Sequence, residues 1–274
     1  MKYYNETFVY NNFIPIQVKH LNNFDFVPHW HMDVEIVLVL QGKIRIGVNS
    51  NHELLSAGDM VVIGSGDIHY FDSLGLASSI ASLIFSPELL DSKTGWPKNG
   101  QLQYPFLKKK DFQEESLEHL ANSFQSVVTE EREKKPMCDM IIKAKLLEMS
   151  GLILRCIPIV DNKEESKAGY AVKNRRMKGI LTYIEENFSL DLSIESIAEK
   201  FDISPFYLSK IFHSVTGMNF RRYINFIRVS EANYLLTNSD KSITDIANEC
   251  GFNSIRTFNR AFKEIKGYTP SNLR

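Results

Sequence analysis

The chain has 274 residues, of which 43% are hydrophobic and 24% are charged, so it is long enough for two domains with buried cores. Its formal net charge is −1, but the charges are divided unevenly along the chain. Residues 173–274 carry 15 basic and 11 acidic side chains, which leaves 17 basic and 22 acidic side chains in the first 172 residues. The basic C-terminal part favours contact with phosphates, and its modest excess indicates that bulk charge alone does not provide the affinity.

Several classes of protein are excluded by the same sequence. The longest strongly apolar run, residues 36–40, is far too short to cross a bilayer, so we expect no membrane partner. The first six residues lack the apolar core of a signal peptide. Cys138, Cys156 and Cys250 show no C-x-x-C spacing and fit as small buried side chains, which indicates a reducing, cytoplasmic location. We find no nucleophile elbow, P-loop or dinucleotide fingerprint, so we do not expect an enzyme.

The N-terminal part has the pattern of short β-strands. Residues 35–40, 43–48, 60–63 and 79–85 are rich in β-forming side chains, and Gly, Asn, Asp and Ser separate them. Even spacing of this kind is typical of a small barrel or jelly roll. We therefore assign residues 1–110 to a β-barrel domain.

Three histidines and a carboxylate recur in this domain at spacings that can bring them together. On a strand, His29 and His31 point to the same face, and Glu35 lies an even number of residues from both. The full pattern resembles the two cupin motifs, with glycine at position 64 where cupins usually have proline, and it reads His29-x-His31-x3-Glu35-x6-Gly42, then Gly58-x5-Gly64-x-Gly66-x2-His69. This resemblance implies a cluster of three imidazoles and one carboxylate inside the barrel.

Three interpretations of the cluster remain open. It can be an effector pocket, in which these groups hydrogen-bond polar hydroxyls beside aromatic walls. It can be a divalent metal site, because such a set binds Zn, Fe, Mn or Ni. It can also be a structural cluster that only hydrogen-bonds within the barrel. Our working hypothesis is the pocket, without a cofactor, and it assigns effector contacts to His29, Trp30, His31, Glu35, His69 and Tyr70.

The apolar pattern of residues 111–160 predicts two antiparallel helices, which are followed by a linker. The stripe in residues 116–133 has helical spacing, Pro136 interrupts it, and residues 140–157 form a second and more apolar segment that Pro158 ends. Part of this surface suits packing on the barrel, and the excess on the second helix suits a two-fold interface between chains. Residues 161–173 are polar and contain a glycine, so we assign them as the linker, with a helix starting at Asn174.

The last third of the chain contains a duplicated segment. Residues 193–198 (Ser-Ile-Glu-Ser-Ile-Ala) return 49 positions later as residues 242–247 (Ser-Ile-Thr-Asp-Ile-Ala). Each copy predicts a short helix, a turn and a longer helix, with N-cap serines at Ser193, Ser204, Ser242 and Ser254. Pro205 suits a first helical position and Gly251 suits a left-handed turn. Each copy is therefore predicted to be a helix-turn-helix.

A predicted helix over residues 220–236 joins the two copies. As a helix it would span about 25 Å. It could hold two reading helices about one DNA turn apart, roughly 34 Å, so that one chain reads two successive major grooves.

Residues 174–274 resemble the AraC/XylS family of transcription regulators. The resemblance rests on the segment Ile243-x-x-Ile246-Ala247-x-x-Cys250-Gly251-Phe252, followed by Phe258, Arg260, Phe262, Lys263, Gly267, Thr269 and Pro270. It implies base-reading positions in both copies, at Phe206, Ser209, Lys210, Ile255, Arg256, Thr257, Asn259 and Arg260. The whole chain is thus predicted as a multidomain α+β protein, with a cupin-like barrel, a helical dimerisation segment and an all-α domain with two helix-turn-helix motifs.

The resemblance also implies partners and a mode of action. We expect a homodimer that binds double-stranded DNA and responds to a small-molecule effector, with a sugar as the expected effector class. The family favours activation of transcription, in which RNA polymerase is a further partner. Two alternatives stay open. One is a metal-dependent cupin enzyme fused to a DNA-binding domain, and the other is a constitutive DNA-binding protein with a vestigial barrel.

Overall fold

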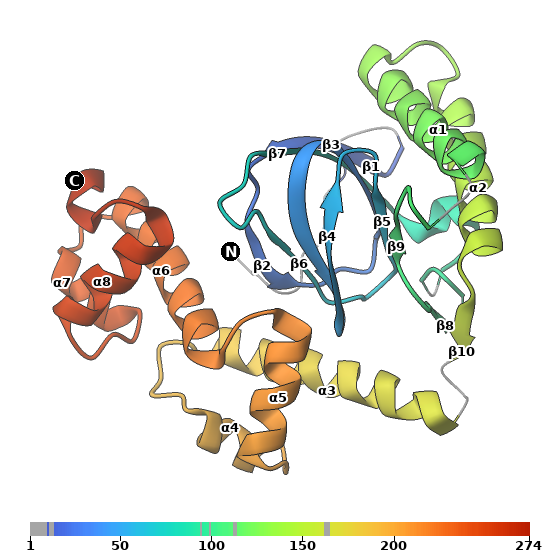
Figure 1. Cartoon of the computed structure of the whole chain (residues 1–274). Coiled ribbons are helices and arrows are strands. Elements are labelled where there is room, and N and C mark those ends of the chain that lie inside the picture. The colour runs from blue at the N-terminus through green and yellow to red at the C-terminus, as the bar shows by residue number, and fades with distance from the viewer. Residues whose placement is uncertain (1–9, 11–13, 94, 99, 112–113, 162–164) are drawn as a thin grey trace. The chain divides into compact units, whose positions relative to one another are not determined.

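The computed structural model describes residue 10 and residues 14–93, 95–98, 100–111, 114–161 and 165–274. These residues fall into two compact units, one within residues 6–174 and the other within residues 175–274. The first is rich in β-strands and carries a helix pair, and the second is helical (Figure 1). The predicted fold class, a cupin-like barrel followed by an all-α domain, is confirmed. The expected absence of a signal peptide concerns residues that lie outside the described ranges.

Antiparallel strands build the barrel of the first unit. They are β1 (Ile16–Asn22), β2 (Phe26–His29), β3 (Val34–Val48), β4 (Asn51–Ser56), β5 (Met60–Ile63), β6 (His69–Asp72), β7 (Ser78–Phe85) and β9 (Phe106–Leu107). Hydrogen bonds follow the order β1-β7-β3-β5-β9, while β4 and β6 pair with β3 and β2 pairs with β6. A short pair, β8 (Gly100–Leu102) with β10 (Ile159–Asp161), lies apart from this sheet.

Strand β3 belongs to both halves of the barrel. Its first half pairs with β5 and β7, and its second half pairs with β4 and β6. The two separate strands predicted at residues 35–40 and 43–48 are therefore one continuous strand. The chain bends at Gly42, which has a φ of 71° and a register shift beside it, so it passes from one half to the other without reversing. A Cβ at Gly42 would lie 1.9 Å from the carbonyl oxygen of Ala77, so only glycine fits this bend.

Alternation along β3 separates two hydrophobic cores. Val37 and Val39 point into the barrel, where they join a core that includes Ile46, Val61 and Phe71. The intervening side chains, Val34, Ile36 and Leu38, face outward into a second core. Glu35 alternates with the outward residues and so faces the barrel interior.

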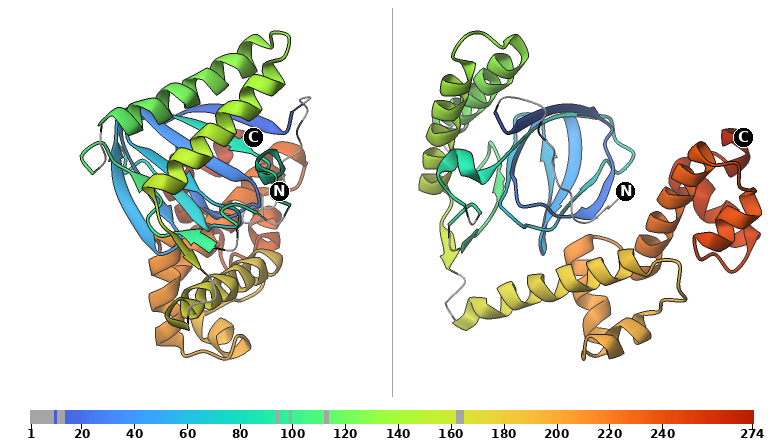
Figure 2. Two further views of the ribbon diagram at one scale, coloured as in Figure 1. Left: turned by 90° about the vertical axis from the view of Figure 1, so that its right-hand side faces the viewer. Right: turned by 180° about the vertical axis from the view of Figure 1, so that it is seen from behind.

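The outer face of the sheet is covered by two helices, α1 (Glu114–Glu133) and α2 (Cys138–Cys156), as Figure 2 shows. Leu120 and Phe124 from α1, with Leu146 and Ile153 from α2, pack on the strands and are fully buried. The predicted helix pair is confirmed. A single-turn helix, η1 (Pro87–Leu90), also contacts α2.

Helix α3 (Glu165–Glu186) differs from the prediction at its start. The predicted linker, residues 161–173, is helical from Glu165 onward, and residues 162–164 lie outside the described ranges. The segment contains good helix formers such as Glu, Lys and Ala, so its polar composition was a poor guide to flexibility. The helix begins nine residues before Asn174, where we expected it.

The second unit contains both predicted helix-turn-helix motifs. They are α4 (Ile194–Lys200) with α5 (Pro205–Thr216), and α7 (Ile243–Glu249) with α8 (Ile255–Lys266). Corresponding helices have equal lengths, seven and then twelve residues, which confirms the repeat. All four predicted serine N-caps accept a hydrogen bond from a first-turn backbone N–H. Helix α6 (Phe220–Asn238) joins the motifs, and η2 (Pro270–Leu273) ends the chain.

The core of the second motif is continuous with α6. Val229 and Ala232 of α6 pack against Phe258 and Phe262 of α8, with Cys250 fully buried among them. Burial raises the pKa of the Cys250 thiol to about 12, so this side chain is an inert hydrophobic group, as predicted. Cys138 and Cys156 were predicted to be buried too, but they lie at the two ends of α2 and are only half-buried. Within the described ranges, no helix combines the length and the apolar character that a membrane span requires.

Candidate functional site

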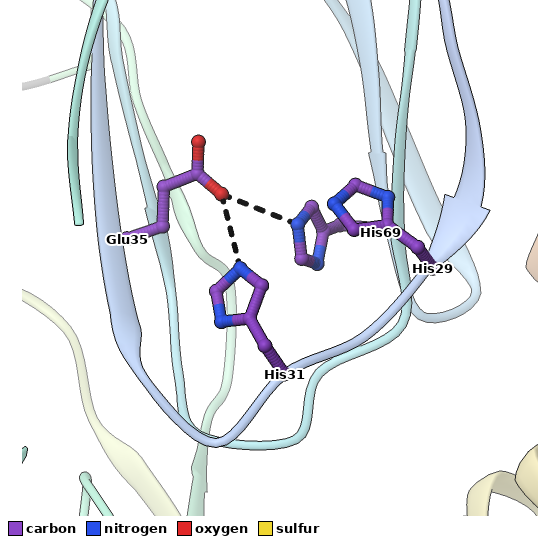
Figure 3. Close-up of side chains that lie close together, drawn as sticks. All are labelled: His29, His31, Glu35 and His69. Atoms are coloured by element: carbon purple, nitrogen blue, oxygen red, sulfur yellow. Dashed lines mark hydrogen bonds and ion pairs between the residues drawn. The ribbon is translucent and has the colours of Figure 1, made fainter. Parts of the chain in front are cut away.

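The three histidines and the carboxylate converge inside the barrel (Figure 3). Glu35 comes from β3, His29 ends β2, His69 begins β6, and His31 lies in the connection between β2 and β3. His31 is therefore not on the same strand as His29, contrary to the simple strand argument, yet both side chains reach the cluster. All four residues are buried, with exposed fractions of 4% or less.

Glu35 is the centre of this arrangement. Its Oε2 lies 3.3 Å from the Nε2 of His31 and 3.2 Å from the Nε2 of His69. Its Oε1 accepts a hydrogen bond of 2.6 Å from the hydroxyl of Ser82, on β7. The His29 ring packs at 3.9 Å between centroids from the ring of His69 and so completes the group.

Backbone carbonyls fix the orientation of all three rings. Because a carbonyl oxygen only accepts, the Nδ1 of each ring must carry a hydrogen, and each Nε2 faces the cluster. The hydrogen bonds of 2.9–3.0 Å run from His29 to Val27, from His31 to Asp33 and from His69 to Asp67. When neutral, each ring therefore presents an Nε2 lone pair to the interior.

Electrostatics in the cluster favour a neutral ring beside an ionised carboxylate. Burial, reinforced by the neighbouring His69 and His31, holds the pKa of His29 well below its usual range. Burial by itself would raise the pKa of the Glu35 carboxyl, but the contacts with His31 and His69 outweigh it and the pKa lies well below its usual range. A buried carboxylate needs a positive partner, which is either a protonated imidazole or a bound cation.

A cavity of about 310 Å³ adjoins the cluster. His29, Glu35 and Ser82 line its polar end, and Lys19 of β1 adds a cationic group. The rest of the wall is apolar and includes the rings of Phe24, Phe26 and Phe71. Its size and its mixture of apolar walls with few polar groups are typical of a small-molecule site.

Four of the six predicted effector contacts do not line this cavity. His31 and His69 contact Glu35 within the cluster but are not part of the cavity wall. Tyr70 lies between His69 and Phe71 on β6, so its side chain points to the opposite face and covers Gly47. Trp30 follows His29 and is half-buried away from the cavity wall. Alternation explains the positions of Tyr70 and Trp30, because the neighbour of an inward-facing residue points outward on an extended strand.

Sequence reasoning missed Lys19, Phe24, Phe26 and Ser82. Ser82 offered a usable signal, since it is a polar residue at even spacing from the inward-facing Ile80 and Ile84 of an apolar strand. Lys19 and the two phenylalanines offered none. Lys19 on β1 and Phe26 on β2 pair with strands far away in the sequence, and Phe24 lies in the connection between β1 and β2.

The donor set fits a divalent cation. One ligand atom from each of His29, His31, Glu35 and His69 lies within 4.8 Å of all the others. The outward hydrogen bonds from each Nδ1 are the arrangement that orients histidine ligands around metals. The buried Nε2 of His69 lies 3.2 Å from the Oε2 of Glu35, so a cation placed between these atoms would contact both.

A second candidate site covers the exposed faces of α5 and α8. The predicted base-reading residues lie there, near the start of each helix, and all are exposed except the half-buried Thr257. Phe206 is 81% exposed, and Ile255 is also exposed, which is unusual for large apolar side chains. The buried faces carry the predicted stripes, such as Leu208 with Phe212 and Phe258 with Phe262.

Comparisons with family models match both parts of the chain. A model described as a helix-turn-helix domain matches residues 197–274, and a model described as a cupin domain matches residues 22–80. The first match contains α5 to α8, and the second contains His29, His31, Glu35 and His69.

Two relatives extend the similarity over most of the chain. The transcriptional activator RhaS of Citrobacter koseri is 27% identical over 254 residues, which are 91% of this chain and 87% of the relative. RhaS of Escherichia coli is 24% identical over 91% of this chain and 88% of its own length.

Solved structures also match. The C-terminal domain of AraT, a response regulator from Geobacillus stearothermophilus, is 33% identical over 36% of this chain and 83% of that domain, with a TM-score of 0.35. ToxT from Vibrio cholerae, solved with an unsaturated fatty acid bound, is 15% identical over 97% of this chain and 96% of its own, with a TM-score of 0.45.

Proposed function

Since the chain belongs to the AraC/XylS family of DNA-binding transcription regulators, we propose that it is an effector-controlled activator that works in the cytoplasm as a homodimer. The observation that carries the proposal is the presence, in one chain, of two capped helix-turn-helix motifs and a barrel cavity that ends in a polar cluster. Control by an effector requires that the effector bind two states of the protein with different affinities. The activator relatives support activation, and an activator has RNA polymerase as a further partner.

Helices α5 and α8 supply the base contacts in this proposal. Arg256 and Arg260 can each bind guanine with two hydrogen bonds, and Asn259 can bind adenine in the same way. The exposed apolar side chains of Phe206 and Ile255 suit contact with thymine methyl groups. Ser209, Lys210 and Thr257 complete the predicted reading faces.

Selection of duplexes from a randomised pool, with the full-length protein, tests this assignment. The Arg256→Ala and Arg260→Ala variants should each lose about 1–3 kcal/mol of binding energy and tolerate more sequences at one base pair. Lys263→Ala, which removes a charge on the same helix, should weaken binding to all sequences alike. Unchanged footprints in both arginine variants would contradict the reading face, and no selection of any sequence would contradict the function itself.

We assign the effector to the barrel cavity, and the cavity's chemistry supports a sugar. Glu35, Ser82 and His29 can hydrogen-bond hydroxyl groups, and Phe24 and Phe71 offer rings for the apolar faces of a pyranose. The low pKa of Glu35 keeps a charged acceptor available at neutral pH.

Thermal-shift measurements against a panel of monosaccharides test the assignment. A sugar that binds the native state should raise the melting temperature by mass action. Glu35→Ala should abolish this response, whereas Tyr70→Phe, outside the cavity wall, should respond as the wild type does. If no sugar stabilises the protein, or if Glu35→Ala responds normally, the sugar assignment is wrong.

A divalent cation is a second candidate occupant, and the convergence of four buried ligand atoms within 4.8 Å of one another is the observation that favours it. His29, His31, Glu35 and His69 would hold the ion, and it would supply a positive charge that orients an oxygen atom of the effector. Metal analysis of protein purified without a histidine tag decides this point. Less than about a tenth of an equivalent would exclude a structural or effector-binding metal.

The dimer interface is assigned to the exposed face of α2. Met140, Leu147 and Leu154 recur at seven-residue spacing and are exposed, and Ala144 and Gly151 between them are small enough for close helix contact. An isologous pairing of this face with a second copy would cover the stripe.

Light scattering of wild type and two matched variants tests the interface. At concentrations on the order of tens of micromolar, Leu147→Glu should give a monomer mass. Leu54→Glu changes a leucine of similar exposure, 43% against 44%, on β4 and should remain dimeric. A wild-type protein that is monomeric with and without DNA would contradict the homodimer.

A further inference from the structure

A basic groove lies between the first turns of α6 and one side of α8. Only some of the residues that line it belong to the predicted base-reading face of α8. Its volume is about 410 Å³. The polar residues that matter here come from both helices: Asn219, Arg221, Arg222 and Asn225 from the start of α6, and Thr257 and Arg260 from α8. Both helices belong to the C-terminal unit, so the groove is internal to one compact body.

The groove carries more positive charge than the structure neutralises. Three guanidinium groups, of Arg221, Arg222 and Arg260, line it against the single carboxylate of Glu264. Within the described part of the chain, none of these three arginine side chains has an ion pair or a side-chain hydrogen bond. The first turn of α6 also has no acidic residue, although a carboxylate would be favourable there. Unpaired arginines that converge on a hollow are an arrangement suited to an anion with several oxygens.

The position of the groove indicates which anion. Thr257 and Arg260 belong to the predicted base-reading face of α8, so the groove is continuous with that face. The other wall of the groove is the start of α6, which follows α5 directly: only residues 217–219 separate α5 from α6. Two reading helices in successive major grooves face the phosphates that border the minor groove between them. The groove is formed by α8 and by the start of the helix that follows α5, so those phosphates would pass along it.

We propose that this groove binds the DNA backbone between the two major-groove contacts, with Arg221 and Arg222 as phosphate ligands. The proposal rests on the DNA-reading function of α5 and α8 and adds residues that lie outside both helix-turn-helix motifs. Phosphate contacts fix the register of a protein on DNA and carry no sequence information. Arg221 and Arg222 therefore set affinity and the spacing of the two reading helices, while α5 and α8 set sequence preference.

The salt dependence of binding distinguishes phosphate contacts from base contacts. Full-length wild type, Arg221→Ala, Arg222→Ala and the double variant are titrated with a duplex selected from a randomised pool and with a scrambled duplex of equal length. Each lost phosphate contact should reduce the slope of log K against log salt by about 0.9, and the double variant by about 1.8. The ratio of affinities for the two duplexes should not change. Arg176→Ala is the matched control, because it removes an exposed arginine on α3 that does not line the groove.

Phosphate ethylation interference with the selected duplex locates the contacts. Wild type should show interference at phosphates between the two protected major grooves, and the double variant should lose these signals alone. The proposal is overturned if the double variant keeps the wild-type slope of log K against log salt. It is also overturned if Arg176→Ala lowers that slope as much as the groove variants do, because such a result would indicate an effect of overall charge. A changed ratio between the two duplexes would show base reading and overturns it as well. If wild-type protein selects no duplex, it is the DNA-reading function that fails.

Discussion

Replacing Glu35 by alanine removes the group on which the barrel cluster is centred. In the structure, the carboxylate accepts the hydroxyl hydrogen of Ser82 at 2.6 Å and lies within 3.3 Å of the Nε2 atoms of His31 and His69. Without it, the buried Ser82 hydroxyl, 1% exposed as a residue, loses its acceptor. A buried donor left without a partner costs about 1–3 kcal/mol. Water that enters from the adjoining cavity offsets part of this cost.

This cost is large enough to measure by calorimetry. For a unit of this size, each kcal/mol lowers the melting temperature by about 2–4 °C, so Glu35→Ala should lower it by roughly 2–12 °C. Affinity for a selected duplex should be unchanged, because the substitution lies in the other compact unit.

A double-mutant cycle with Ser82→Ala separates the hydrogen bond from general damage to the barrel. The double variant leaves no orphaned hydroxyl, so its destabilisation should be smaller than the sum of the two single losses by about 0.5–3 kcal/mol. Additive losses, or a wild-type melting temperature for Glu35→Ala, would refute the reasoning about the cluster.

Two further predictions concern stability. Gly251 has a φ of 80°, and a Cβ there would lie 2.6 Å from the carbonyl oxygen of Ser189, so Gly251→Ala should cost more than about 1 kcal/mol in urea denaturation. Gly267→Ala, at a φ of 79° with open space around it, should cost less, and equal losses would show that the close approach is unimportant. Hydrogen bonds from Lys145, His119 and Ser123 lower the pKa of Glu148 to about 2, so its contribution to stability is complete above its unfolded pKa of 4.5 and is lost as pH falls toward 2. The difference in melting temperature between wild type and Glu148→Gln should therefore shrink over that range, and a constant difference would exclude the ionised contacts as its source.

The C-terminal half was predictable because its signals are local. N-cap serines such as Ser204, the proline that follows it, and the paired apolar stripes fix the helix boundaries within a few residues of chain. The duplication gave a second, independent copy of each signal. The two arginines at the start of α6, Arg221 and Arg222, are evident in the sequence. Their proximity to Arg260 could not be predicted, because it depends on how α6 and α8 pack against each other.

In the barrel, the sequence predicted that the three histidines and Glu35 form a cluster. It did not predict all the residues that line the adjoining cavity. The cluster of histidines with Glu35 could be found because the motif is specific, although His31 reaches it from a connection rather than from a strand. Ser82 and Lys19 enter the cavity through long-range strand pairing, with β7 between β1 and β3. Pairing of this kind depends on contacts distant in the chain, which the spacing of nearby residues does not encode.

The central claim is that one chain reads two successive major grooves on one face of a duplex. Methylation-interference mapping of the full-length protein on its selected duplex tests this most directly. The account predicts two clusters of contacted bases about 10 base pairs apart for each bound chain, with Arg256→Ala and Arg260→Ala affecting one cluster and Lys210→Ala the other. A single cluster for each chain, or loss of both clusters in every variant, would contradict it.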